Sequence, residues 1–377
     1  MEKIISAKVY EPAATDGFTG LDYIIEVPEG KDITILQITD AQAMLYEGIR
    51  KTFLDENGRS YDNDRRFLQV HHAFFTNGVT DAYTRSWQYI EEGIRKTNPD
   101  ILVLTGDNIY GETDDRGTLW TEMIEFLDSF GIPWLCVYGN HDNESQMGVH
   151  WQSEAVRKSG YGCLKEGTTT NGNCNYTVGI RQGNTLRYVL YMLDTNGCRL
   201  KPHNFGESLL PYNPDLADLQ QTEGIFPDQL EWIRDCGRKI SAYAPDASSM
   251  MFMHIPPVEA YLALAEKYGD ACRKLPFTAD RGSDMGIATE AIGGIDTRGQ
   301  LMEAAEQVRC TGIFAGHQHK VAISTFYRGI RLTYGLKTGT GDYHDPAMLG
   351  TTKITIHETD DSFDVDYIFT DIAYPLK

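Results

Sequence analysis

Long hydrophobic runs are missing from this 377-residue sequence. It contains no stretch of 18 consecutive apolar residues, which is about the length that a helix needs to cross a bilayer. Residues 1–6 also lack the apolar core of a secretory signal peptide. We therefore expect a soluble, cytoplasmic protein without a membrane partner, although a chain whose export signal had been removed would look the same.

Clusters of positive charge are missing as well. The formal net charge is −20, and no run of Lys and Arg would build a basic groove. Such a surface repels polyanions, so we expect no nucleic-acid partner. A small phosphate ester could still bind, because bound metal ions would be the largest local charges in a site.

Several motifs of other protein classes are absent. The seven cysteines include no Cys-x-x-Cys pair, which argues against a disulfide framework or a zinc ribbon. The glycine-rich segment 335–341 lacks the spacing of a P-loop, so it does not indicate an NTPase. We expect this segment to support the edge of a site. There is also no Ser or Cys nucleophile motif.

The sequence does contain many short apolar runs bounded by polar turns, which predict strands. These runs are 33–38, 101–105, 134–138, 187–193, 250–253, 312–315, 321–326, 330–334 and 353–356. Patterns with a period near 3.6 predict helices over 81–97, 118–130, 227–238 and 300–308. Strands and helices alternate in the first half, whereas sequential strands in the second half predict a second sheet with antiparallel pairs.

Five of the predicted strands are followed directly by side chains that bind metals. These are Asp40 in Thr-Asp-Ala-Gln, Asp107 in Gly-Asp-Asn-Ile-Tyr, Asn140 in Gly-Asn-His-Asp, His254 after the run 250–253, and His317 and His319 in Gly-His-Gln-His. The carboxyl edge of an α/β sheet is where sites are built. Oxygen and imidazole ligands that converge there suit Fe, Mn or Zn.

This ordered set of motifs resembles the calcineurin-like metallophosphoesterase superfamily over residues 33–345. The segments 105–108, 139–145 and 332–335 are similar to the branch related to purple acid phosphatases. The resemblance implies an α/β fold, a four-layer α/β/β/α sandwich with two mixed sheets and the metal site at the carboxyl edge of the strands. We expect a single domain over 1–377, with a core of about 33–345 and C-terminal strands over 350–370 that complete the second sheet.

The resemblance also implies a ligand set for two divalent or mixed-valence ions of Fe, Mn or Zn. Asp107 would bridge the two ions. Asp40, Asp107 and His319 would hold the first, and Asp107, Asn140, His254 and His317 the second. In this pattern His141 binds a phosphate oxygen or protonates the leaving alcohol, and we expect Asp142 to accept a hydrogen bond from one of its ring nitrogens. A purely structural His141–Asp142 pair is the alternative.

The sequence departs from the common pattern at one ligand. Gln42 stands where the superfamily usually has His, two residues after the first Asp. Purple acid phosphatases also lack that His and use a Tyr three residues after the bridging Asp, which is the position of Tyr110. Tyr110 could therefore complete the first metal site. Alternatively, it could simply pack against the loop, and Gln42 or water would then complete the site.

These expectations together predict a binuclear metal-dependent phosphohydrolase. It would cleave a small phosphate monoester by in-line attack of a metal-bound hydroxide, with His141 assisting the leaving group. A phosphodiesterase with the same site is one alternative, and a degenerate ligand-binding relative without catalysis is another. The long segments 43–80 and 196–225 would determine the choice of substrate.

Overall fold

Two mixed β-sheets form the centre of the molecule. The structure is a computed structural model that describes residues 20–44, 79–114, 116–145, 147–196 and 224–372. Both sheets contain parallel and antiparallel neighbours. The nine-stranded sheet has the order β1 (Tyr23–Glu26), β6 (Tyr176–Gln182), β7 (Thr185–Leu193), β8 (Ser248–Met253), β11 (Cys310–Ala315), β13 (Ile330–Tyr334), β12 (Val321–Tyr327), β10 (Met285–Ala288) and β9 (Phe277–Ala279). The six-stranded sheet has the order β15 (Phe363–Phe369), β14 (Gly350–Ile356), β2 (Ile33–Ile38), β3 (Ile101–Thr105), β4 (Trp134–Val137) and β5 (Gly162–Cys163).

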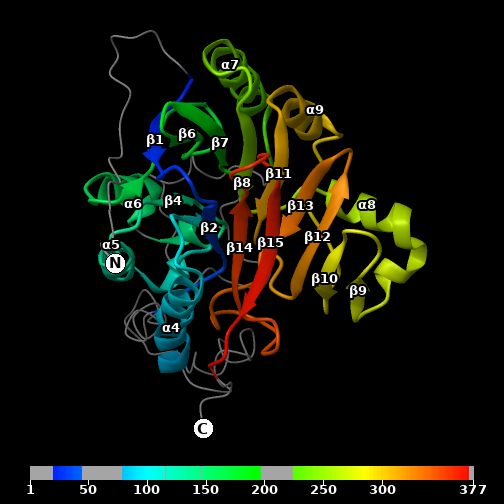
Figure 1. Cartoon of the computed structure of the whole chain (residues 1–377). Coiled ribbons are helices and arrows are strands. Elements are labelled where there is room, and N and C mark those ends of the chain that lie inside the picture. Colours follow the sequence, from blue (N-terminus) through cyan, green and yellow to red (C-terminus); the bar gives the residue numbers. More distant parts are fainter. Residues whose placement is uncertain (1–19, 45–78, 115, 146, 197–223, 373–377) are drawn as a thin grey trace.

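Helices cover the outer face of each sheet (Figure 1). The six-stranded sheet carries α4 (Val79–Thr97), α5 (Thr118–Asp128) and α6 (Gly148–Arg157). The nine-stranded sheet carries α7 (Pro227–Tyr243), α8 (Glu259–Tyr268) and α9 (Gln300–Gln307). The predicted α/β fold, a four-layer sandwich with two mixed sheets, is therefore confirmed.

Alternating side chains of β8 show how the layers are held together. Met250 and Phe252 belong to the core between the two sheets, whereas Met251 and Met253 belong to the core beneath α7, α8 and α9. All four side chains are fully buried. A strand buried on both faces reads as a continuous apolar run, which is why periodicity alone does not reveal its two faces.

Local signals set the ends of two long helices. In α7, Pro227 is the first helical residue, and the side chain of Gln229 accepts a hydrogen bond from the backbone N–H of Phe226. The helix thus begins with a preset φ and a satisfied N-terminal donor. Helix α4 ends just before Asn98-Pro99, where the proline disfavours a further helical residue.

The C-terminal strands lie in a different sheet from the one predicted. We expected the strands over 350–370 to complete the second sheet, but β14 pairs antiparallel with β2 in the six-stranded sheet, and β15 follows at its edge. Ile354 lies opposite Ile35 across this pair. The apolar residues of β14 would fit either sheet, so the local pattern did not identify its partner.

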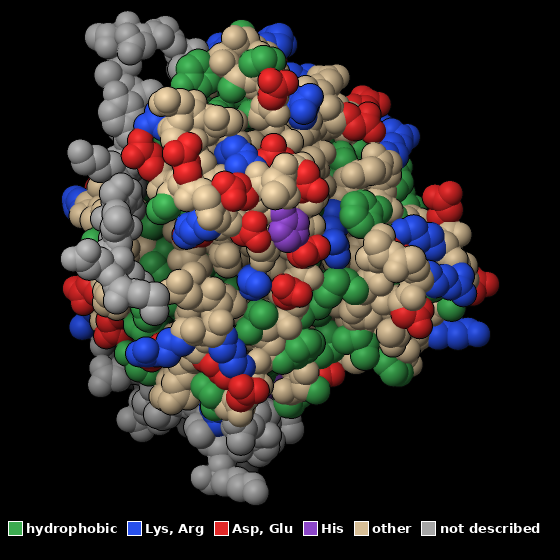
Figure 2. Space-filling model, in the orientation of Figure 1, with side chains coloured by type: hydrophobic (Ala, Val, Ile, Leu, Met, Phe, Trp, Pro, Cys, Tyr) green, Lys and Arg blue, Asp and Glu red, His purple; other side chains and the backbone are tan. Residues whose placement is uncertain are grey.

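No helix in the described part of the chain has both the length and the apolar character to span a bilayer. On the face drawn in Figure 2, acidic and basic side chains are interspersed, so the net charge is not concentrated in one patch there. Most of the segments 43–80 and 196–225, predicted to choose the substrate, lies outside the described residues.

Candidate metal centre

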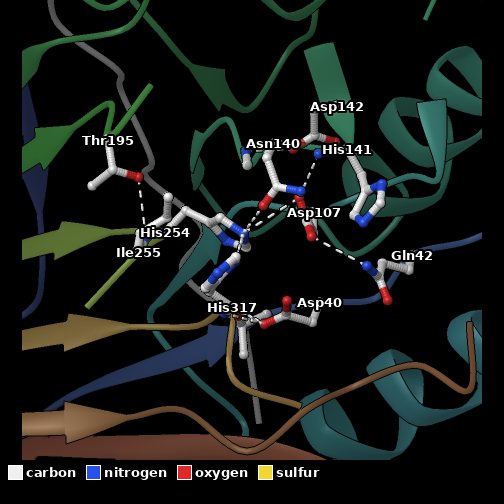
Figure 3. Close-up of polar contacts among 12 residues, drawn as sticks. Asp40, Gln42, Asp107, Asn140, His141, Asp142, Thr195, His254, Ile255 and His317 are labelled. Carbon is white, nitrogen blue, oxygen red and sulfur yellow. Dashed lines mark hydrogen bonds and ion pairs between the residues drawn. The ribbon is translucent and has the colours of Figure 1, made fainter. Parts of the chain in front are cut away.

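The five predicted ligand segments meet at one edge of the sandwich. Asp40, Asp107 and Asn140 follow β2, β3 and β4, which are parallel neighbours in the six-stranded sheet. His254 and His317 follow β8 and β11, which are parallel neighbours in the nine-stranded sheet. The carboxyl ends of both sets of strands therefore face each other across the core, as Figure 3 shows.

One group of donor atoms surrounds His254 Nε2. It lies 3.2 Å from Asn140 Oδ1, 3.4 Å from Asp107 Oδ1 and 3.2 Å from His317 Nδ1 (Figure 3). The other ring nitrogen, Nδ1, lies 2.9 Å from the carbonyl oxygen of Thr105. A hydrogen bond from Nδ1 to that oxygen leaves Nε2 as the atom that can bind a metal.

A second group consists of Asp40, Asp107 and His319. One ligand atom from each residue lies within 4.8 Å of the others, and all three side chains are buried. His319 Nε2 is 3.3 Å from Asp40 Oδ1, while its Nδ1 is 2.7 Å from the carbonyl oxygen of Tyr343. Asp107 belongs to both groups, which is the position that a bridging carboxylate requires.

The ionisation of Asp40, Asp107 and His317 fits metal binding. Burial alone would raise the pKa of Asp40, but His319 and His254 lower it below the usual value. Burial also opposes ionisation of Asp107, yet the neighbouring His254 and His141 hold its pKa well below the ordinary range. Burial and His254 lower the pKa of His317 to about 3, so its imidazole is neutral, as a ligand must be. Burial lowers the pKa of His254, but Asp107 outweighs burial and raises it to about 9, so a metal would have to displace a proton from this imidazole.

One buried oxygen also suits a cation. Asp40 Oδ1 accepts no hydrogen bond from the described residues, although Asp40 is 1% exposed. A buried carboxylate oxygen without a donor is costly in a protein that binds nothing there. The donor set, its burial and this oxygen together fit a centre for two divalent ions, whose identity the side chains leave open.

The backbone at the ligands is shaped by close approaches. Asp40, Asp107 and His317 have φ values of 49°, 49° and 70°, in the left-handed region that non-glycine residues rarely adopt. A Cβ atom at Gly139 would lie 2.1 Å from Asp107 Oδ1, and one at Gly316 would lie 1.9 Å from Thr39 Oγ1. Gly139 thus lets two neighbouring loops of the six-stranded sheet approach each other, and Gly316 lets a loop of the nine-stranded sheet approach the residue before Asp40.

His141 lies beside the centre, but its partner is not the predicted one. Its Nδ1 is 2.7 Å from Glu144 Oε2, and both side chains are buried. Asp142 instead accepts hydrogen bonds from the backbone N–H groups of Asn108, Ile109 and Gly139 and from the Asn108 amide. The expected His141–Asp142 pair is therefore wrong, because Asp142 is fully used in tying together two metal-binding loops.

Glu144 also determines the charge of His141. Burial lowers the pKa of the imidazole, but Glu144 and Asp107 outweigh burial and raise it to about 10. The ring carries a proton over the neutral range, and its Nε2 lies 3.7 Å from Asp342 Oδ2. The sequence signal that could have identified Glu144 is its spacing, because residues 141 and 144 lie at opposite ends of the single turn η2 (Asp142–Glu144).

The two residues proposed to complete the first site differ in their surroundings. The Tyr110 ring stacks on His141, with the ring centroids 4.4 Å apart, and the side chain is 1% exposed. Whether its phenolate reaches a metal stays a prediction. Gln42 donates from Nε2 to Asp107 Oδ2 at 3.1 Å (Figure 3) and accepts at Oε1 from the ammonium of Lys337, a buried residue that the sequence did not single out.

A comparison with known families agrees with this geometry. The sequence model described as calcineurin-like phosphoesterase matches residues 33–321. The chain belongs to this family. The matched region contains Asp40, Asp107, Asn140, His254, His317 and His319. Members of this family are metal-dependent phosphoric ester hydrolases, which is the class predicted from the motifs.

Curated relatives of this chain are distant. It is 24% identical over 281 residues to "Probable inactive purple acid phosphatase 14" of Arabidopsis thaliana, which covers 70% of this chain and 64% of that protein. It is 25% identical over 260 residues to "Phosphatase DCR2" of Saccharomyces cerevisiae, which covers 66% of this chain and 38% of that protein. The chain thus spans less than two thirds of the length of either relative.

Solved structures resemble this chain only loosely. A dimetal phosphatase from Danio rerio has a TM-score of 0.43 at 13% identity, with 88% of this chain and 98% of that chain covered. The family assignment rests on the sequence match and on the ligand motifs.

Proposed function

We propose that this phosphoesterase hydrolyses a small phosphate monoester at a centre of two divalent metal ions. The observation that carries the proposal is the position of Asp107. Its carboxylate lies 3.4 Å from His254 Nε2 and also within 4.8 Å of ligand atoms from Asp40 and His319. One carboxylate shared by two sets of donors is the arrangement of two-metal hydrolases.

The chain would contribute metal ligands and a proton donor, most of which are buried. Asp40, Asp107 and His319 would hold one ion, and Asp107, Asn140, His254 and His317 the other. Bound there, the ions would activate water and neutralise charge on the phosphoryl oxygens. His141, protonated and fixed by Glu144, would donate from Nε2 to the oxygen of the leaving alcohol.

The net charge of the chain supports a small substrate. A net charge of −20 disfavours the binding of long polyanions. The negative charge of a small phosphate monoester would instead lie next to the metal ions. A phosphodiesterase with the same residues is the second candidate. The name "Probable inactive" of one relative motivates a third, a ligand-binding protein without catalysis. The buried donors that this chain retains around Asp107 favour the enzyme.

The test is a panel of esters with metal-free protein and added Mn²⁺, Fe²⁺ or Zn²⁺. We expect metal-dependent release of phosphate, faster from a mono-aryl than from a bis-aryl phosphate. Faster cleavage of the bis-aryl phosphate would show that the protein is a phosphodiesterase. A protein that takes up two metals and cleaves neither ester would overturn hydrolysis in favour of binding, and one that takes up no metal would overturn the centre itself.

A further inference from the structure

Lys337 is a buried lysine beside the metal centre. It lies three residues after the end of β13, and its side chain is 1% exposed. Its Nζ donates to the carbonyl oxygen of Asp40 at 2.9 Å and to Gln42 Oε1 at 2.6 Å. A lysine ammonium supplies only donors, so it cannot itself bind a cation. Its contribution must pass through the groups that it holds.

The contact with Lys337 decides which way the Gln42 amide is turned. An ammonium can meet only the oxygen end of a carboxamide, so Oε1 points to Lys337. The nitrogen end therefore faces the carboxylate, and Nε2 donates to Asp107 Oδ2 at 3.1 Å (Figure 3). An amide binds a hard cation through its oxygen, and here that oxygen is already engaged by the lysine.

We propose that Lys337 is a positioning residue that keeps Gln42 out of the first metal site. Held by Lys337, Gln42 acts as a hydrogen-bond donor to the shared carboxylate of Asp107 and not as a ligand. The ion held by Asp40, Asp107 and His319 then lacks a donor at the position where the superfamily pattern has His. This ion is the more weakly bound of the two. The inference rests on the proposed two-metal centre and adds an unequal affinity to it.

The segment that carries Lys337 is fixed against the Asp40 loop. The backbone N–H of Thr338 donates to Thr39 at 2.8 Å, and that of Gly339 donates to Asp40 at 3.2 Å. A Cβ atom at Gly339 would lie 1.8 Å from the Ala41 carbonyl oxygen, and one at Gly341 would lie 2.1 Å from that of Gln42. The backbones of residues 338–341 and 39–42 pack closely against each other, so the fold keeps Lys337 within hydrogen-bond distance of Gln42.

The experiment is a calorimetric titration of metal-free protein with Mn²⁺, combined with thermal unfolding without metal. Lys337→Met keeps the length of the side chain and removes its donors. Gln42 is then free to turn its oxygen to the metal, so we expect the weaker site to bind about tenfold more tightly, the gain of one modest ligand. The unfolding temperature should fall, because two buried acceptors lose their donor.

Opposite changes in affinity and stability distinguish positioning from a merely structural role. The control is Lys267→Met, which removes an exposed lysine whose ammonium donates to the buried Asp284 at 2.7 Å and to Thr325 at 3.2 Å, neither of them a candidate ligand. This control should lower the unfolding temperature and leave both Mn²⁺ affinities unchanged. If Lys337→Met weakens the lower-affinity site together with the fold, the inference is overturned.

A second variant keeps the inference testable even if Lys337→Met does not fold. Gln42→Leu removes an outer hydrogen bond to Asp107, which both ions share, so it should weaken both sites to a similar extent and by no more than roughly 100-fold. A loss confined to the weaker site would make Gln42 a ligand of that site and overturn the inference. In the Gln42→Leu background, Lys337→Met should no longer tighten the site. Wild-type protein that binds fewer than two Mn²⁺ ions would instead refute the two-metal centre.

Discussion

Nδ1 of His141 and Oε2 of Glu144 lie 2.7 Å apart within a single turn, and both side chains are withdrawn from solvent. The carboxylate fixes the ring and holds its pKa at about 10, against the opposing effect of burial. One ring nitrogen is thus anchored by Glu144 and the other lies 3.7 Å from Asp342 Oδ2, and in the proposed reaction the ring would serve as the proton donor. Its value to the reaction depends on how poor the leaving group is.

The first prediction concerns this proton donor. His141→Ala should lower turnover of alkyl phosphates by about 100-fold or more, with both metals still bound. Nitrophenyl phosphate should lose less, because nitrophenolate leaves without a proton. Steady-state kinetics on both esters measure the difference. Equal losses would assign His141 to phosphate binding, and loss of metal would make it structural.

The second prediction separates Glu144 from Asp142. Glu144→Gln should reduce turnover with the same bias against alkyl phosphates as His141→Ala, but by a smaller factor, since the ring remains and only its anchor is weakened. Asp142→Asn should instead lower the unfolding temperature, because Asp142 accepts from the backbone of two ligand loops. Glu144→Gln with full turnover on both esters would show that the pair has no part in catalysis.

The third prediction concerns the shared carboxylate. Asp107→Asn should weaken both metals, by more than the roughly 10- to 100-fold that loss of an outer hydrogen-bonding partner costs. Activity should fall in parallel, while circular dichroism shows an intact fold. His254→Ala should affect chiefly one metal and Asp40→Ala chiefly the other. An Asp107→Asn protein that retains two metals and its rate would refute the bridge.

The fourth prediction tests Tyr110. If its phenolate completes the first site, protein loaded with ferric iron should show a tyrosinate-to-iron band in visible absorption, and Tyr110→Phe should bleach it and release iron. If the ring only packs on His141, the ferric protein is colourless and Tyr110→Phe barely changes iron retention. The second outcome would rule out a site of the purple acid phosphatase type but would not contradict the proposed phosphoester hydrolysis.

The fifth prediction is a pH dependence of stability at Asp228, far from the ligands. Burial opposes its charge, but hydrogen bonds of 2.8 Å from the Asn171 backbone and amide prevail and lower its pKa. A lowered pKa stabilises the fold above the unfolded value of about 3.9, and this stabilisation is lost as pH falls through the folded value. Asp228→Asn should cost about 1 kcal/mol at pH 7 and progressively less below pH 4. Urea unfolding across this range measures the difference, and a gap independent of pH would contradict the assignment.

The sequence was sufficient for the parts of the site that depend on strand ends. Runs such as 33–38 and 101–105 are buried strands that lead into Asp40 and Asp107. An apolar run bounded by polar residues predicts such a strand from the local sequence alone. The partner of β14 is not local, because Ile354 and Ile356 would suit either sheet.

Side-chain pairing was harder to predict for the same reason. Asp142 and Glu144 both lie within reach of His141 along the chain, and only the turn shows that Asp142 faces the backbone of the neighbouring loops. Lys337 was missed because a lone lysine in a glycine-rich loop is usually exposed. Its burial depends on how closely Gly339 and Gly341 let that loop approach residues 41 and 42.

The place of β14 has a consequence for the order in which the molecule can be assembled. Strand β2, which leads into Asp40, has β3 on one side and β14 on the other, and β14 is about 315 residues later in the chain. A nascent chain on the ribosome can form the β2–β3 pair early, but β2 stays an open edge until residues 350–356 emerge. Strand β2, which leads into the candidate ligand Asp40, therefore has both of its neighbours only after residues 350–356 have been made. Such a topology folds slowly and leaves β2 exposed to other chains in the meantime.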